Sequence, residues 1–163
     1  MLLNLGCDRA AVFEMHNGKD NPSGLPFLYI DMTHEEVRDG VKELDDECDN
    51  LNIARYRIMS YLWENRIFAG TIDELKAIDN KFVLKACDND TKKVVLVMLK
   101  TTEDMGVMEL AFNNEELDMG KAEVLGKLLD YVQPISNWLD IKNQSVNKCS
   151  YGKVSETSEN VEG

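Results

Sequence analysis

The fold of this chain is decided by two neighbouring segments, DRAAVFEMHNG at residues 8–18 and SGLPFLYIDM at residues 23–32. Val12 to His16 and Phe27 to Met32 are dense in β-branched and aromatic residues, as strands are. The residues between them, Gly18 to Gly24, are rich in turn formers, which predicts an exposed loop. We therefore expect two consecutive strands joined by a long polar hairpin loop.

A helix is predicted directly after the second strand. Thr33 to Glu36 have the form of a capping box, in which the threonine hydroxyl and the glutamate carboxylate satisfy each other's backbone amides. Apolar residues with helical spacing follow at Val37, Val41, Leu44 and Cys48. Because the acidic residues from Asp45 onward oppose the helix dipole, we expect this helix to end at about Asp49.

Two more helices are predicted in the middle of the chain. Ile53 to Trp63 carries one apolar face, and Phe68 to Gly70 interrupts the pattern. A second capping box, Thr71 to Glu74, begins another helix. Its inward residues are predicted to be Leu75, Ile78 and Phe82.

The second half of the chain returns to strands and then to a helix. Val94 to Leu99 is apolar on both faces, which is typical of a central strand, and a hairpin loop joins it to Val107 to Phe112. A helix follows from about Glu116 to Ile141, and Pro134 should kink it or end its first half. This order predicts an α+β domain, with a central antiparallel sheet, a helical insertion and a long C-terminal helix.

Composition favours one acidic domain over residues 1–142, followed by an acidic tail, residues 143–163, that we expect to be disordered. With 18 basic and 30 acidic residues the net charge is −12, which argues against nucleic acid as a partner. The four cysteines lack metal-ligand spacing and predict buried free thiols in a reducing compartment. We find no secretion signal and no apolar run of membrane-spanning length, so we expect no membrane contact from this chain.

These elements resemble a GAF-like domain, a relative of the PAS fold. The resemblance lies in D-R-x-x-V-F at residues 8–13, the apolar strand at 94–99 and G-V-x-x-L at 106–110. More narrowly, H-N-G at 16–18 and G-L-P-F at 24–27 resemble a group of GAF-like proteins from tailed bacteriophages. The resemblance implies a GAF/PAS-type sheet and, for the phage group, a place in the host cytoplasm or the virion.

The chain also departs from that family. Too few residues precede the first strand for the usual opening helix, and the cysteine–histidine pair of the tetrapyrrole-binding subgroup is absent from the late insertion. Asn80-Lys81-Phe82 matches only the start of the cyclic-nucleotide motif, and we interpret Phe82 as a core residue. We therefore expect no cofactor.

A set of polar residues near the first hairpin is the predicted ligand-binding site. Its members are His16, Asn17, Glu14, Tyr29, Asp31 and Arg55. The simplest interpretation of His16 is structural, as a strand-end histidine that fixes the hairpin loop; ligand contact and catalysis are the alternatives. The sequence contains no signature of a nucleophile, phosphate loop or metal site, so we expect no enzymatic activity and no metal.

Two functional hypotheses follow. The first is a structural or interaction module that docks to a protein partner or to copies of itself; the resemblance implies that it is phage-encoded, for example a component of a virion ring or connector. The second is a small-molecule sensor that holds its ligand between the sheet and the helical insertion, as the resemblance implies.

Overall fold

The computed structural model describes residues 6–16, 28–44, 47–99, 106–114, 126–128 and 130–137. Its labelled elements are, in chain order, β1 (Arg9–His16), β2 (Tyr29–Val37), β3 (Leu51–Asn52), the 3-10 helix η3 (Ile53–Arg55), α1 (Arg57–Asn65), β4 (Ile67–Thr71), α2 (Ile72–Ala86), β5 (Lys93–Leu99) and β6 (Gly106–Phe112). In the described part of the chain the strands form one antiparallel sheet in the order β3-β2-β1-β6-β5-β4. The predicted α+β class is confirmed.

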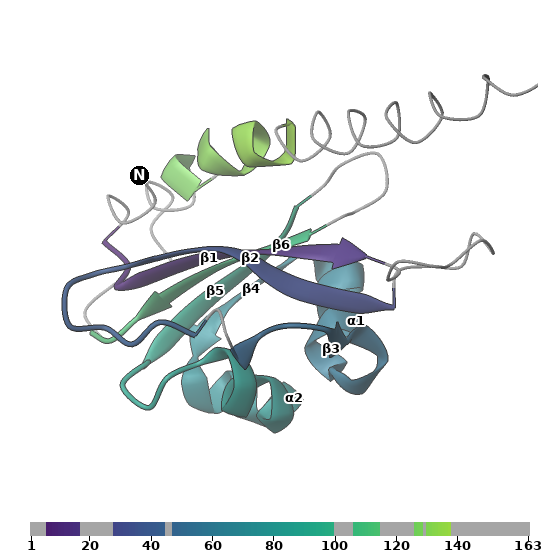
Figure 1. Ribbon diagram of the computed structural model, residues 1–163, viewed down its shortest axis with the longest axis horizontal. Helices are drawn as coiled ribbons and strands as arrows, with labels where there is room; N and C mark the ends of the chain where they lie inside the picture. Colours follow the sequence, from purple (N-terminus) through teal and green to yellow (C-terminus); the bar gives the residue numbers. More distant parts are fainter. Residues whose placement is uncertain are drawn as a thin grey trace, which may run out of the picture.

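The sheet is covered on both faces (Figure 1). Helices α1 and α2 pack on one face, where Phe13, Ile30 and Phe82 belong to a large buried cluster. The helical residues 126–128 and 130–137 lie over the other face, where Leu128 packs with residues of β1, β5 and β6. Because β5 and β6 contribute to both clusters, they are buried on both sides, as the apolar run over residues 94–99 predicted.

The predicted helix over residues 33–49 is wrong. Strand β2 continues to Val37, paired with β1, and Thr33 is the additional residue of a β-bulge, because Val12 pairs with His34 while Phe13 pairs with Met32. The bulge reverses the alternation of side chains. The pairing with β1 therefore outweighs the local capping-box pattern.

The bulge has a consequence for Glu35. It places Glu35 opposite Ala11, on the face that packs against α1 and α2. There both carboxylate oxygens of Glu35 accept from the backbone amide of Leu44, at 2.9 and 3.1 Å, and fix the irregular segment that follows β2. Leu44 and Cys48, predicted to be helical, are buried in the core, and neither residue is itself part of a helix.

The middle of the chain is partly as predicted. Residues 53–63 divide into η3 and α1, and Phe68 to Gly70 is the centre of β4, which pairs with β5, rather than an interruption between helices. The capping box at the start of α2 is confirmed, with the Thr71 hydroxyl accepting from the Glu74 amide at 3.3 Å and the Glu74 carboxylate accepting from the Thr71 amide at 2.7 Å.

Helix α2 contains a break at Asp79 that was not predicted. The backbone of Asp79 is extended (φ −152°, ψ 85°), and the buried carboxylate accepts from the amide of Phe82 at 3.0 Å. Its other oxygen accepts from the amide of Ile58 at 3.1 Å, in the first turn of α1, where the N-cap residue Tyr56 makes no side-chain bond. One carboxylate thus caps the second half of α2 and the start of α1.

The C-terminal helix is confirmed where it is described. Residues 130–137 are helical, so the helix continues through Pro134 rather than ending there. The first hairpin loop at 17–26, the loop at 102–105, the remainder of the predicted helix over 116–141 and the tail at 143–163 lie outside the described residues. No helix in the described part of the chain is long and apolar enough to span a membrane.

Candidate functional site

A groove opens beside α1, on the face of the sheet that α1 and α2 cover. One wall is held by two hydrogen bonds: the side chain of Asn52 caps η3 by accepting from the amide of Ala54, and the Ile53 amide donates to the Leu28 carbonyl at 2.9 Å. The opposite wall is α1, whose start is fixed by Asp79. These contacts bring three segments that are separate in the sequence to one place.

The groove is mainly apolar and has a volume of about 490 Å³. The residues that line it, in chain order, are Met15, Leu28, Ile53, Ala54, Met59, Ser60, Trp63 and Glu64. Met15 and Met59 are buried, whereas Leu28 and Trp63 are 39% and 47% exposed, unusual values for large apolar side chains. A concave apolar surface with few polar groups is typical of a small-molecule site.

Several of the polar residues predicted around His16 lie close together, but they do not line the groove. His16 Nε2 lies 3.0 Å from Asp31 Oδ2, and its ring stacks on Tyr29 with 5.8 Å between centroids. The other oxygen of Asp31 accepts from the backbone amide of Asn50. The carbonyl of His16 also accepts from the Leu28 amide at 3.3 Å, so His16 closes the base of the hairpin.

Glu14 lies beside this pair, where its carboxylate accepts from the Thr33 hydroxyl at 2.8 Å. Strand alternation separates all of these side chains from the groove. Met15 and Ile30 point into the core beneath α1 and α2, so their neighbours Glu14, His16, Tyr29 and Asp31 point to the other face of the sheet. The predicted set is thus not the lining of a pocket between sheet and helical insertion, and its ligand contact remains a prediction.

The other two predicted site residues do not join this group. Arg55 is exposed at the end of η3, and Asn17 lies outside the described residues. Several residues that line the groove were predicted in other roles: Met15 and Leu28 as parts of the first two strands, and Ile53, Met59, Ser60 and Trp63 on or beside the apolar face of a helix. The signal that identifies them is the pair of exposed large apolar residues, which only the structure reveals.

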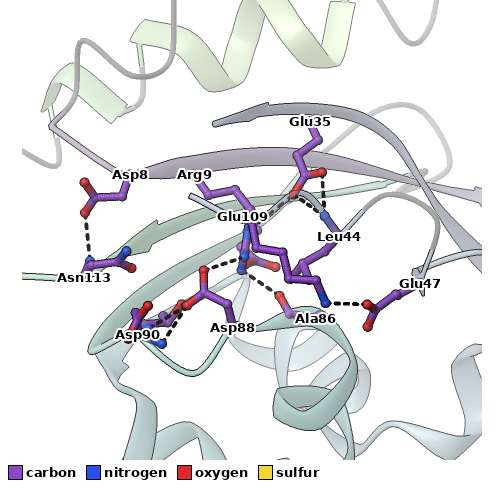
Figure 2. A network of polar contacts seen from close by, with 12 residues as sticks. Asp8, Arg9, Glu35, Leu44, Glu47, Ala86, Asp88, Asp90, Glu109 and Asn113 are labelled. Atoms are coloured by element: carbon purple, nitrogen blue, oxygen red, sulfur yellow. Dashed lines mark hydrogen bonds and ion pairs between the residues drawn. The ribbon is translucent and has the colours of Figure 1, made fainter. Parts of the chain in front are cut away.

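A buried charge network centred on Arg9 was also missed (Figure 2). The guanidinium of Arg9 donates to Glu109 Oε1 and to the Ala86 carbonyl, both at 2.8 Å, and lies 3.3 Å from Asp88 Oδ2 and 3.7 Å from Glu35. It therefore ties β1 to β2, β6 and the end of α2. The sequence signal was the Asp8-Arg9 pair together with Glu109, a lone charge within the apolar strand VMELAF.

Glu109 is fully buried, and its Oε2 atom has no hydrogen-bond partner in the described structure. Burial raises the pKa of the Glu109 carboxyl above its usual range, although the guanidinium of Arg9 opposes this shift. Three carboxylates surround one guanidinium, so neutralising Glu109 relieves an excess of buried negative charge.

The described cysteines are free, as predicted, and Cys7 and Cys48 are buried. Burial raises the pKa of Cys7 to about 11 and that of Cys48 to about 12, which keeps both thiols protonated and weakly reactive at neutral pH. Among the described residues, no group of three or more histidine, cysteine or acidic side chains has the arrangement of a metal site.

The chain is similar to known proteins in its structure but not in its sequence. No family model and no curated protein sequence matches the chain. The GAF domain of a two-component sensor histidine kinase from Bacillus halodurans matches with a TM-score of 0.64 and 13% identity, covering 90% of each chain. The fold is that of a GAF domain.

Two further GAF domains have this fold. The PixJ GAF domain from Thermosynechococcus elongatus, in its blue-light absorbing form, has a TM-score of 0.55 and 13% identity and covers 91% of this chain and 86% of that chain. A GAF domain from Synechocystis in its photoproduct state has a TM-score of 0.51 and 17% identity and covers 92% of this chain and 90% of that chain. The GAF-like resemblance is confirmed for the fold.

Proposed function

We propose that this GAF-fold domain is a non-enzymatic sensor that binds a small molecule in the groove beside α1. The observation that carries the proposal is the groove itself, which is about 490 Å³ in volume, mainly apolar and built from β1, η3 and α1. This volume lies within the range of small-molecule sites. Further support comes from the structural neighbours, since one belongs to a sensor histidine kinase and two are described by their light-dependent states.

The proposal is tested by comparing ligand binding to the wild-type protein with binding to a variant whose groove is filled by a large side chain. Native mass spectrometry and a thermal-shift screen with a metabolite panel are applied to the wild-type protein and to Ala54→Trp, which places an indole in the groove. The matched control is Ala69→Trp, the same change at an exposed position of β4 outside the groove.

At a ligand concentration of 100 times Kd, binding stabilises the folded state by about 2.7 kcal/mol, which is a readily measured shift. We expect hits that stabilise the wild type and Ala69→Trp but not Ala54→Trp. A panel without any shift or bound mass contradicts the proposal, as do hits that bind Ala54→Trp equally well.

A second candidate is a docking module of a phage-encoded assembly. It is favoured by the half-buried group of His16, Tyr29 and Asp31, which lies at the end of the first hairpin and on the face away from the groove. Paired substitutions at His16 and Asp31 are expected to weaken assembly and, because Asp31 also accepts from the Asn50 amide, to lower the free energy of unfolding by about 1 kcal/mol. Light scattering that shows a strict monomer, with no co-purifying partner, counts against this candidate.

A further inference from the structure

The residues that line the groove indicate which class of ligand it would bind. Resting on the function proposed above, we propose that the ligand is a small organic cation, an amine with an apolar body, whose charged end lies against Glu64 and Trp63. The apolar body of the ligand would pack against Met15 and Met59, which form the buried floor of the groove. Both side chains are unbranched and adapt to ligands of different shape.

Helix α1 arranges the polar and apolar parts of the lining in two adjacent rows. Met59 and Trp63 are one turn apart and form the apolar row, and Ser60 and Glu64, also one turn apart, form the polar row at its edge. A ligand lying along α1 therefore meets an apolar surface on one side and a hydroxyl and a carboxylate on the other. This is the pattern that an amphipathic amine requires.

The charge of the groove disfavours an anionic ligand. Glu64 is the only charged side chain among the described residues that line it, and it makes no hydrogen bond or ion pair with the rest of the described chain. The chain as a whole carries a net charge of −12. An anionic ligand would meet repulsion with no lysine or arginine in the described lining to offset it, whereas a cation is attracted.

Trp63 adds a second reason for a cation. Its side chain is 47% exposed at the rim of the groove, and the face of an indole attracts an ammonium group more strongly than other aromatic rings do. A neutral ligand of the same shape gains the apolar contacts but neither the carboxylate nor the cation–π contact.

The test compares three probes that share one skeleton and differ in one terminal group: 4-phenylbutylamine, 4-phenylbutan-1-ol and 4-phenylbutyrate. The sequence has two tryptophans, so Trp138→Phe leaves Trp63 as the only one, and its fluorescence reports on the groove. Each probe is titrated into this background protein and into the same background with Glu64→Gln. The matched control is Glu43→Gln, an exposed glutamate outside the groove.

We expect the amine to bind about tenfold more tightly than the alcohol, and the carboxylate most weakly. Glu64→Gln should remove most of this preference without weakening the alcohol, and Glu43→Gln should leave it unchanged. Equal binding of amine and alcohol, or a preference for the amine that Glu64→Gln leaves undiminished, overturns the cation inference. Failure of all three probes, or metabolite hits that are all neutral or anionic, also overturns it. The sensor proposal then stands or falls separately with the Ala54→Trp comparison.

Discussion

Asp79→Ala is the sharpest test of how the walls of the groove are positioned. The substitution removes two buried hydrogen bonds at once, from Phe82 N at 3.0 Å and from Ile58 N at 3.1 Å. Losing one helix N-cap costs about 1 kcal/mol, and a buried amide left without a partner costs roughly 1–3 kcal/mol. We therefore expect a loss of roughly 2–4 kcal/mol in the free energy of unfolding, and a fall in Tm of roughly 6–12 °C for a domain of this length.

Urea unfolding followed by far-UV circular dichroism measures this loss, provided that the slope of the transition is unchanged. Asp79→Asn is the informative companion, because its single carbonyl oxygen can accept from only one of the two amides; we expect about half of the loss. The control is Asp73→Ala on the same helix, an 86% exposed side chain in the first turn, with an expected change of less than about 0.5 kcal/mol. A cost for Asp79→Ala no larger than that of the control refutes the shared-cap account.

Three other predictions concern the core and the caps. Since the pKa of Glu109 is raised in the folded state, its contribution to stability is present below its unfolded value of about 4.5 and is lost as the pH rises through the folded value. Glu109→Gln should thus gain stability relative to wild type as urea unfolding is repeated from pH 5 to pH 8; a constant or falling difference contradicts the raised pKa. Thr71→Ala breaks the capping box of α2 and should cost about 1 kcal/mol in the same assay, and a negligible cost would show that the box contributes nothing. The thiols of Cys7 and Cys48 should react with Ellman's reagent far more slowly in the native protein than in urea, and rapid native reaction of both would contradict their burial.

The sheet was largely predictable because its strands carry their own signal. The apolar run over 94–99 and the turn-bounded segments around the first hairpin could each be predicted as strands from their own residues alone. The capping box at Thr71 was equally predictable, since both of its hydrogen bonds are made within four residues. Elements with local determinants are those that the sequence reveals.

The wrong predictions of secondary structure concern segments whose conformation is determined by pairing with a strand that is distant in the sequence. Thr33 to Glu36 satisfies the capping-box pattern, yet pairing with β1 keeps it extended and directs Glu35 toward Arg9. Strand β4 has only five residues and contains a glycine, so its extended conformation depends on pairing with the neighbouring strand β5. Glu109 stands out as a lone charge in an apolar strand, but no local pattern pairs it with Arg9, because the two residues are 100 positions apart.

The same limit applies to the candidate site. Four members of the predicted site, Glu14, His16, Tyr29 and Asp31, do lie near one another, because neighbouring strands of a hairpin bring such residues into register. The sequence could not place them on the face away from α1, nor show that Leu28 and Trp63 are left exposed around a groove. Those facts depend on how η3 and α1 pack against the sheet.

The central claim, that a ligand binds beside α1, is tested most directly by methyl NMR of protein labelled at its methionines. Met15 and Met59 line the groove, whereas Met98 and Met108 are buried in the sheet and serve as internal controls. On titration with a hit from the metabolite panel, the account predicts large shifts of the Met15 and Met59 methyl signals and little change at Met98 and Met108. Shifts confined to the control methyls, or a bound ligand that leaves Met15 and Met59 unmoved, would contradict it.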